Sequence, residues 1–484
     1  MDDSPFIMRF FVYPTCRKYG KISIMARKKK NDPVNGNKTE NKDREVATVT
    51  GRNSSRLKPY SSDRVIRWDR LDNTANLFPA IAGENATNVY RISVTLFEKI
   101  DPERLQKALD IILPKMDGFN VRLRKGFFWF YFEENGKPAP RVTAENTFPC
   151  RFIRANRNHS YLFRVTYYDR RINLEVFHVL TDGMGGINFL RELTYQYLRL
   201  SHEELAGEGD AFDDDTSLNL DDSFVRNYKA FKPRGFERKK AYLIKAEKLP
   251  EGEFGLMHGY LPIAQMKEVC KKYDVSVNTY LVADFAYSVY VSCLKKGASD
   301  KPIRIAVPVN LRPYYDSNTT KNFFMMVSAE FHPDDKEYSF EEVLRIIDSS
   351  LKSQINKEHL EDLFSYGVGN QQNLALRLFP LPIKIVAMRI VYNQSALANT
   401  TTVTNIGKIR IDERYEPYIE RFHANIAMSK GQYLKGTICA FRDDYVFTFS
   451  TVYADTSVER VFFKQLKSDG VGVRIETNGV FVNQ

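Results

Sequence analysis

The sequence predicts a mixed α/β (α+β) protein built of two lobes. Its 484 residues are more than one ordinary hydrophobic core holds and enough for two or three. Patterns of alternating strands and helices occur twice along the chain, on either side of an acidic, loop-like stretch. The composition, 43% hydrophobic and 13% aromatic, supplies enough apolar material for folded cores and excludes wholesale disorder.

Residues 1–62 are predicted to form a disordered basic tail. The first 60 residues carry 14 Lys and Arg against 6 Asp and Glu, whereas the rest of the chain has only three more basic than acidic residues. Polybasic segments of this kind are usually solvated and disordered, with DNA or anionic lipid as the alternative partner. Because the body of the chain is almost neutral, we do not expect nucleic acid as a partner.

The start of the chain does not resemble a secretory signal. Asp2 and Asp3 precede its apolar run and Arg9 interrupts it, which is the reverse of the order in a signal peptide. The run Met25-Ala-Arg-Lys-Lys-Lys reads like a second beginning, so translation from Met25 is one explanation of the tail. We therefore expect a cytoplasmic protein.

The N-terminal lobe is predicted over residues 63–201. Its strands are expected at 88–96, 127–132, 164–168 and 172–179, and its helices at 102–116 and 187–200. The last of these strands alternates cleanly, with Ile172, Leu174 and Val176 on one face. An acidic stretch follows, and residues 202–255 are predicted to be a linker that crosses between the lobes.

The C-terminal lobe is predicted over residues 256–484. Its strands are expected at 258–261, 303–308, 325–331, 400–403, 438–441 and 445–452, and its helices at 264–272, 278–294, 340–357 and 457–466. Ser276 has the residue type and position of a cap for the second helix. The strands at 438–441 and 445–452 are expected to pair antiparallel.

Several classes of protein are excluded by the absence of their motifs. The five cysteines never occur as CxxC, which excludes a disulfide scaffold and a cysteine-rich zinc site and fits a reducing compartment. The chain has no dinucleotide-binding glycine fingerprint, no P-loop and no HExxH metal motif. No run approaches the ~18 uncharged apolar residues that a membrane span needs. Even the most hydrophobic stretch, 374–392, contains Arg377, Lys384 and Arg389.

His178 has the most informative surroundings of the seven histidines. It ends the strand at 172–179, four residues before Asp182, and a turn containing Gly183, Gly185 and Gly186 opens the next helix. A histidine is a natural general base near neutral pH, and glycines allow a tight turn and the close approach of a substrate. The alternative is structural, because a strand-end histidine beside an aspartate is often only a hydrogen-bonded core pair.

The segment Phe177-His178-Val-Leu-Thr-Asp182-Gly183 resembles a known signature. It is similar to the HxxxDG part of the HHxxxDG motif of the chloramphenicol acetyltransferase-like, CoA-dependent acyltransferases. The resemblance continues in Val307-Pro-Val-Asn-Leu-Arg312-Pro followed by Asn322-Phe, and in Thr404-Asn405-Ile-Gly407. Trp68-Asp-Arg-Leu-Asp resembles the opening of the alcohol acetyltransferase branch. The segments occur in the family's order across about residues 65 to 470.

The resemblance implies two lobes of similar fold, each a mixed sheet with helices, and a tunnel between them. It implies that His178 is the general base in a direct transfer from an acyl-CoA to an alcohol or amine, without an acyl-cysteine. Asp182, Gly183 and Arg312 would have structural roles, with Asp182 paired to Arg312, and Asn405 would bind substrate. It implies no metal and no cofactor other than acyl-CoA as co-substrate. We expect a monomer.

Two departures from the family pattern leave alternatives open. Phe177 replaces the first histidine of the doubled pair, and the DFGWG motif of the plant branch is absent. The enzyme could instead be of the condensation type, taking its acyl group from a carrier protein. It could also be a non-catalytic binding protein that retains the fold. The few residues after Leu466 leave no room for a carrier domain, which argues against the condensation type. The presence of both His178 and Asp182 argues against a non-catalytic protein.

Overall fold

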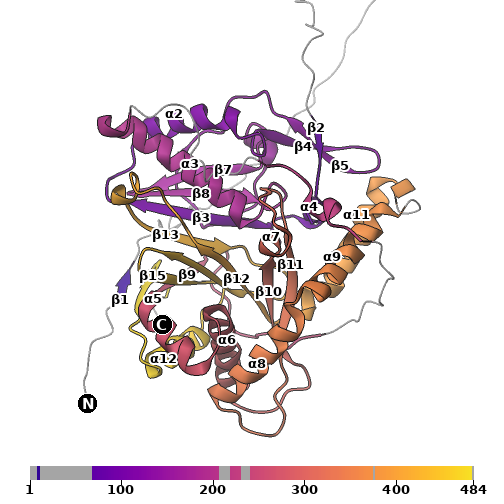
Figure 1. Ribbon diagram of the computed structural model, residues 1–484, viewed down its shortest axis with the longest axis vertical. Coiled ribbons are helices and arrows are strands. Elements are labelled where there is room, and N and C mark those ends of the chain that lie inside the picture. The colour runs from indigo at the N-terminus through magenta and orange to yellow at the C-terminus, as the bar shows by residue number, and fades with distance from the viewer. Residues whose placement is uncertain are drawn as a thin grey trace, which may run out of the picture. The chain divides into compact units, whose positions relative to one another are not determined.

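The computed structural model describes residues 8–10, 68–72, 74–206, 219–229, 240–373 and 377–481 (Figure 1). Two large sheets and one small sheet organise this part of the chain. The predicted fold class, a mixed α/β protein with two lobes built on mixed sheets, is confirmed.

A five-stranded mixed sheet forms the core of the first lobe. Its strands follow the order β13-β3-β8-β7-β6, all antiparallel except the β6–β7 pair. Their bounds are β3 (Val89–Leu96), β6 (Thr143–Ala144), β7 (Phe163–Tyr168), β8 (Arg171–Phe177) and β13 (Ile419–Ile426). The helix α3 (Gly183–Ser201) packs on β3 and β8, and α2 (Pro102–Ile112) packs on α3 (Figure 1).

Strand β8 is buried on both faces, although its alternating pattern predicts a single buried face. Ile172, Leu174 and Val176 enter the core as expected. On the opposite face, Glu175 forms ion pairs with Arg91 of β3 and Arg164 of β7. Polar residues on a buried face are stable when each charge has partners, and periodicity alone cannot show such partners.

An eight-stranded sheet forms the core of the second lobe. Its order is β1-β16-β9-β15-β14-β12-β10-β11. The bounds are β1 (Met8–Phe10), β9 (Gly255–Pro262), β10 (Ile303–Asn310), β11 (Phe324–Phe331), β12 (Thr401–Lys408), β14 (Leu434–Phe441), β15 (Asp444–Thr451) and β16 (Arg474–Thr477). The predicted antiparallel pair of β14 and β15 is confirmed.

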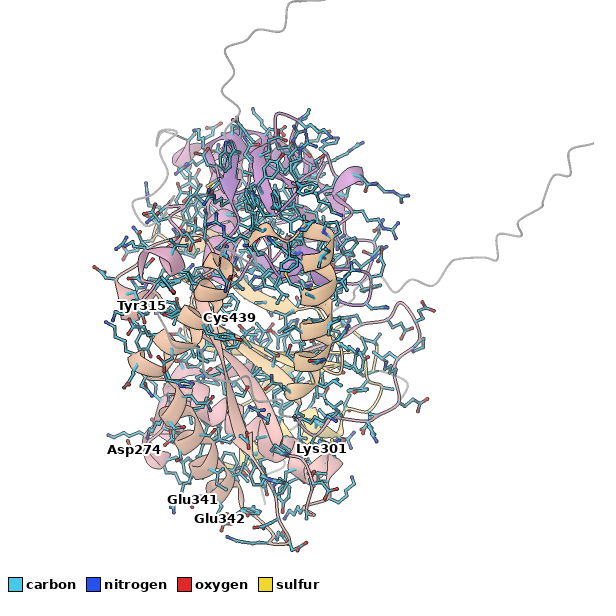
Figure 2. All side chains as sticks on the ribbon, turned by 90° about the vertical axis from the view of Figure 1, so that its right-hand side faces the viewer. Asp274, Lys301, Tyr315, Glu341, Glu342 and Cys439 are labelled. Carbon is cyan, nitrogen blue, oxygen red and sulfur yellow. The ribbon has the colours of Figure 1, made fainter. Side chains whose placement is uncertain are left out.

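Four helices pack around this sheet and one another: α5 (Ile263–Tyr273), α6 (Val277–Cys293), α8 (Phe340–Gln354) and α12 (Ser457–Ser468). The side chain of Ser276 accepts a hydrogen bond from the backbone N–H of Thr279, so the predicted cap of α6 is confirmed. A reciprocal capping box between Ser339 and Glu342 begins α8, near the end of the molecule where Figure 2 labels Glu342.

Strand β13 connects the two lobes. It lies inside the predicted C-terminal lobe, 256–484, yet it pairs with β3 in the sheet of the first lobe and packs against β14 and β15. Dividing the chain into lobes at the predicted linker, 202–255, would therefore separate β13 from the sheet to which it belongs. Hydrophobic alternation indicates a strand but not its partner, which explains why the sequence analysis missed this crossing.

Part of the predicted tail is also structured. Met8–Phe10 forms β1, which pairs parallel with β16 at the edge of the large sheet, so the prediction that all of 1–62 is disordered is wrong for these residues. An exposed sheet edge has unpaired N–H and C=O groups that accept even a short extra strand. The rest of the predicted tail lies outside the described residues.

A small sheet, five further helical segments and several short 3₁₀ turns complete the described part of the chain. The sheet has the order β2-β5-β4, with bounds β2 (Trp68–Arg70), β4 (Val121–Lys125) and β5 (Phe130–Glu134). The helices are α1 (Phe78–Ile81), α9 (Lys357–Gln372) and α11 (Leu381–Ser395), and short helical turns are α4 (Ser223–Arg226) and α7 (Arg312–Tyr315). None of the helices in the described ranges has the length and apolar character to cross a membrane.

We predict that a chain beginning at Met25 is less stable than the full chain. It lacks β1, so β16 loses its parallel partner. Each backbone hydrogen bond contributes about 0.5–1.5 kcal/mol net, so the free energy of unfolding should fall by about 1–3 kcal/mol. Urea unfolding of both chains measures this difference, and identical midpoints would show that β1 contributes nothing.

Candidate active site

His178 directly follows β8 and faces a small group of aromatic rings. Its backbone N–H donates to the carbonyl of Asn88, which fixes the chain where the strand ends. The imidazole stacks on Phe78 with ring centroids 4.8 Å apart, and Tyr90 presents its edge at 5.1 Å. The ring is partly buried. These contacts restrict its rotation without enclosing it completely.

The imidazole is oriented by a hydrogen bond to Asn322. Nδ1 of His178 lies 2.9 Å from Oδ1 of Asn322, and the amide of Asn322 in turn donates to a carboxylate oxygen of Asp72 at 2.9 Å. A carbonyl oxygen only accepts, so Nδ1 must carry the hydrogen. The neutral ring therefore keeps the lone pair of Nε2, the atom that can accept a proton.

Backbone and burial fix Asp72, the first member of the hydrogen-bonded series Asp72–Asn322–His178. The other carboxylate oxygen of Asp72 accepts from the backbone N–H of Ala75 at 2.7 Å, and Asp72 and Asn322 are almost completely buried. Because Asp72 holds the amide nitrogen of Asn322, the oxygen of that amide must face His178. The carboxylate thus selects the orientation of the amide, and the amide selects the tautomer of the histidine.

Burial shifts the pKa values of both His178 and Asp72, in each case toward the uncharged form. Loss of hydration lowers the pKa of His178 below its ordinary value of 6.5, and the negative charge of Asp182 opposes this only partly. His178 is therefore neutral at pH 7 and able to accept a proton. Burial raises the pKa of Asp72 to about 7, although its hydrogen bond from Asn322 acts in the opposite direction.

Asp182 points away from the imidazole and pairs with Arg312, as the sequence analysis expected. The two guanidinium nitrogens of Arg312 contact the two carboxylate oxygens at 2.8 and 3.0 Å. The carboxylate also accepts from the backbone N–H groups of Met184 and Phe323. Asp182 is thus both the N-cap of α3 and the acceptor for the backbone N–H just before β11.

Arg312 uses every donor of its guanidinium group. Besides Asp182, it donates to the carbonyls of Thr319 and Lys321 at 2.8 Å and to the side chain of Asn310 at 3.3 Å. A buried charge with all its donors satisfied is stable, and lysine could not reproduce this fork of bonds. The loop that leads to Asn322 is consequently fixed to the same arginine.

The glycines after Asp182 provide room for neighbours and do not form a separate turn. The helix α3 already begins at Gly183, and neither Gly185 nor Gly186 has a positive φ, so the predicted tight turn is wrong. A Cβ at Gly185 would lie 1.9 Å from Oγ1 of Thr181, and one at Gly186 would lie 2.6 Å from the hydroxyl of Tyr90. These positions require glycine because the backbone is closely approached.

Asn405 is not brought into contact with His178. It lies exposed within β12, and its Oδ1 accepts a local hydrogen bond from the N–H of Gly407 at 2.8 Å, where φ is +81°. The next residue does reach the site, because Ile406 lies against Gly183 so closely that a Cβ there would be 2.9 Å away. The β12 segment thus borders the histidine loop, while substrate contact by Asn405 stays a prediction.

Phe78, Asp72 and the role of Asn322 were missed by the sequence analysis. Asp72 and Asn322 both lie in segments recognised by resemblance, but the bond between them joins residues 250 positions apart. No local periodicity reports such a contact. The linker also does more than cross between lobes, because Asn219 accepts from the backbone N–H of Thr320 at 2.7 Å and so supports the loop before Asn322.

The cysteines in the described ranges are poorly suited to nucleophilic chemistry. Burial raises the pKa values of Cys150, Cys270, Cys293 and Cys439, that of Cys270 to about 11. Thiolates, which are the reactive form, are therefore disfavoured. Cys16 lies outside the described residues. No group of three or more His, Cys, Asp and Glu residues in the described ranges could hold a metal ion.

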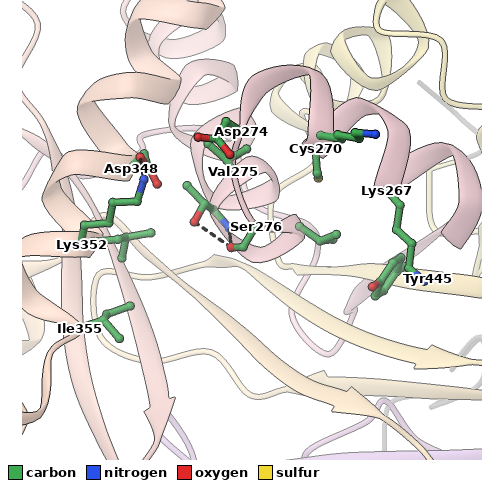
Figure 3. Close-up of a pocket in the computed structure, with 13 residues that line it drawn as sticks. Lys267, Cys270, Asp274, Val275, Ser276, Asp348, Lys352, Ile355 and Tyr445 are labelled. Atoms are coloured by element: carbon green, nitrogen blue, oxygen red, sulfur yellow. Dashed lines mark hydrogen bonds and ion pairs between the residues drawn. The ribbon is translucent and has the colours of Figure 1, made fainter.

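A separate pocket of about 670 Å³ opens between α5, α6 and α8 (Figure 3). Lys267, Cys270, Asp274, Asp348 and Lys352 are among the residues that line it. It contains none of the predicted site residues, so it does not represent the tunnel expected between the lobes. That tunnel stays a prediction.

Comparison with known proteins establishes the fold. No protein-family model and no curated protein matches the sequence. TRI101 from F. sporotrichioides, solved with coenzyme A and T-2, matches with a TM-score of 0.58 and 12% identity, over 84% of this chain and 99% of that one. Polyketide synthase associated protein 5 from Mycobacterium tuberculosis matches with a TM-score of 0.53 and 12% identity, over 82% and 96%.

A third match is the epimerization domain from the third module of tyrocidine synthetase B, with a TM-score of 0.51 and 10% identity, over 84% of this chain and 96% of that one. All three share the arrangement seen here. The chain therefore has the two-lobed fold of the chloramphenicol acetyltransferase-like acyltransferases and condensation-type domains.

We predict that Asp182→Asn lowers the free energy of unfolding by about 3–5 kcal/mol, because it leaves the buried charge of Arg312 without its partner. Arg312→Lys should shift stability in the same direction, since it removes the bidentate fork. Thermal and urea unfolding measure both effects. Glu84→Gln, which breaks the exposed pair with Arg154, is the matched control and should change little. Equal effects at the exposed and buried pairs would contradict this role.

We predict that the ring of His178 titrates below pH 6.5 in the folded protein, because burial disfavours the imidazolium. NMR of the histidine ring protons measures the pKa, and the resonance is assigned by its disappearance in His178→Ala. In Asn322→Ala the pKa should fall further, because the hydrogen bond from Nδ1 to Asn322 favours the charged ring. A titration at or above 6.5 would exclude a ring kept neutral by burial.

Proposed function

We propose that the protein transfers an acyl group directly from an acyl-CoA to an alcohol or amine, with His178 as the general base. The observation that carries the proposal is the hydrogen bond from Nδ1 of His178 to Asn322, which keeps the ring hydrogen on Nδ1 and leaves the lone pair of Nε2 available. The fold supports it, because solved structures with this fold include TRI101 in complex with coenzyme A and T-2 or deoxynivalenol, and TRI3 trichothecene 15-O-acetyltransferase.

In the proposed reaction the acceptor O–H or N–H gives its proton to Nε2 of His178 while its heteroatom attacks the thioester carbonyl. A new C–O or C–N bond forms and the carbonyl becomes an oxyanion. The C–S bond then breaks, and the imidazolium returns the proton to the sulfur of CoA. Acyl-CoA is consumed as a substrate, and the reaction needs no resident cofactor and no acyl-cysteine.

The remaining site residues position the base. Asp72 and Asn322 hold the tautomer, whereas Asp182 and Arg312 fix the N-terminus of α3 to the loop before Asn322. Asn405 is proposed to contact the substrate near the carbonyl. The amide nitrogen of Asn405 would serve as the donor, since its oxygen already accepts from Gly407. Proximity of the two substrates would supply much of the remaining rate enhancement.

A condensation-type enzyme is the second candidate function. The epimerization domain of tyrocidine synthetase B and a condensation domain of a polyketide synthase share the fold at TM-scores of 0.51 and 0.50. Such an enzyme would use the same histidine with an acyl group on a carrier protein. A non-catalytic binding protein is a third reading, left open by Phe177 in place of the first histidine of the motif.

We predict that His178→Ala reduces acyl transfer by about 10²–10⁴-fold, the usual contribution of a general base. Its melting temperature should change little, because the ring is at the edge of the core. The assay follows thiol release from a panel of acyl-CoAs mixed with alcohols and amines, and mass analysis identifies the product.

Cys→Ala variants at positions 150, 270, 293 and 439 are the controls for covalent chemistry, and they should keep most of the activity. An acyl-cysteine trapped by mass spectrometry would overturn direct transfer. Transfer only from a carrier-bound acyl group would favour the condensation-type enzyme. Absence of transfer from every donor, with binding of ligands retained, would favour the non-catalytic protein.

A further inference from the structure

Helix α11 exposes a stripe of large apolar side chains. Ile383, Val386 and Ile390 are 54%, 57% and 53% exposed, and their spacing of three and four residues places them on one face. Leu381, near the start of the helix, is buried against the protein. A helix that is apolar on its outer as well as its inner side is unusual for the surface of a protein surrounded by water. Figure 2 turns this side of the molecule toward the viewer.

The loop between β4 and β5 extends this apolar surface. Phe127 is 70% exposed and Trp129 is 42% exposed, at the tip of the small sheet. The loop is attached to the start of α11, because the backbone N–H of Leu381 donates to the carbonyl of Phe127 at 2.8 Å. The ammonium group of Lys384 donates to the carbonyl of Phe128 at 3.0 Å. We refer to Phe127, Trp129, Ile383, Val386 and Ile390 together as the α11 surface.

All charged side chains in the sequence segment that contains α11 are positive. The sequence contains no Asp or Glu from residue 363 to residue 411, whereas Arg377, Lys384 and Arg389 all lie in or just before α11. Lys384 and Arg389 flank the apolar stripe on opposite sides, as their helical positions require. Lys384 donates to the backbone carbonyls of Phe128 and Arg377, and Arg389 donates to that of Ala80. Neither forms an ion pair with a carboxylate among the described residues.

From these observations we propose that the α11 surface binds the face of an anionic lipid bilayer. Exposed aliphatic side chains flanked by cations, with a tryptophan at the edge, are what the boundary between headgroups and acyl chains accommodates. At 1.5 Å per residue, the 15 residues of α11 extend about 22 Å, less than the ~30 Å of a bilayer core. The helix would therefore lie along the membrane plane.

The surface is adjacent to the candidate active site. Arg389 of α11 donates to the carbonyl of Ala80 in α1 at 2.6 Å, and Phe78 of the same short helix stacks on His178. A bilayer in contact with α11 would thus lie one helix away from the histidine. Membrane binding by itself depends only on the surface and does not depend on the proposed acyl transfer.

The test is flotation of the full chain with vesicles of phosphatidylcholine alone or mixed with phosphatidylglycerol at about three to one. We expect binding to the anionic vesicles, weakened by salt. The variant Ile383→Asp/Val386→Asp/Ile390→Asp should have an affinity for these vesicles that is lower by about tenfold or more, because it replaces the apolar contact with three carboxylates. Because these positions are exposed, its melting temperature should be preserved.

The matched control is Phe97→Asp/Ser349→Asp/Ser353→Asp, which adds the same charge at exposed positions elsewhere and should bind like the natural chain. If the α11 variant does not fold, Phe127→Ser/Trp129→Ser tests the same surface through its loop. Binding that is unchanged in the α11 or loop variants would overturn the proposal and assign vesicle binding to the basic first 60 residues. A dimer that the α11 variant dissociates, without vesicle binding, would show that a second copy covers the surface.

Tryptophan fluorescence provides an independent measurement. The chain has only two tryptophans, Trp68 and Trp129, so Trp68→Phe leaves Trp129 as the single reporter. Its emission should shift to the blue on addition of anionic vesicles and be quenched by brominated acyl chains. Emission that stays unchanged while the protein floats with the vesicles would overturn the proposed orientation.

Discussion

The buried ion pair between Asp182 and Arg312 is the interaction on which the rest of the site depends. Asp182 belongs to the first lobe, where it caps α3, and Arg312 follows β10 in the second lobe. Each charge is removed from water, so each is stable only while the other is in place. The pair is therefore a joint between lobes whose geometry is set by two parallel charge-assisted hydrogen bonds and not by packing alone.

The orientation of His178 follows from this joint. Arg312 holds the carbonyl of Lys321, and Asp182 holds the N–H of Phe323, so the residue between them has its backbone fixed on both sides. That residue is Asn322, whose side chain then reaches His178. The carboxylate of Asp182 thus acts on His178 through a loop from the other lobe.

The fold class and most elements could be predicted from the sequence, because local periodicity and caps decide them. Ser276 is an example, because a serine directly before an apolar run is typical of the N-cap of a helix. The Asp182–Arg312 contact could be predicted only through resemblance to a family, since 130 residues separate its members. The bond from Asp72 to Asn322, the place of β13 and the pairing of β1 depend on which distant segments meet, and neither spacing nor composition contains that information.

The place of β13 in the sheet of the first lobe delays the completion of that sheet during folding. Ile419 pairs with Leu96, so the sheet of the first lobe cannot be completed until more than 300 further residues are available. Such nonlocal pairing raises the contact order and slows folding, and during synthesis β3 has an unpaired edge for most of that time. Residues 63–201 alone therefore lack one strand of the sheet of the first lobe. The first lobe can complete its sheet only after β13 has been synthesised.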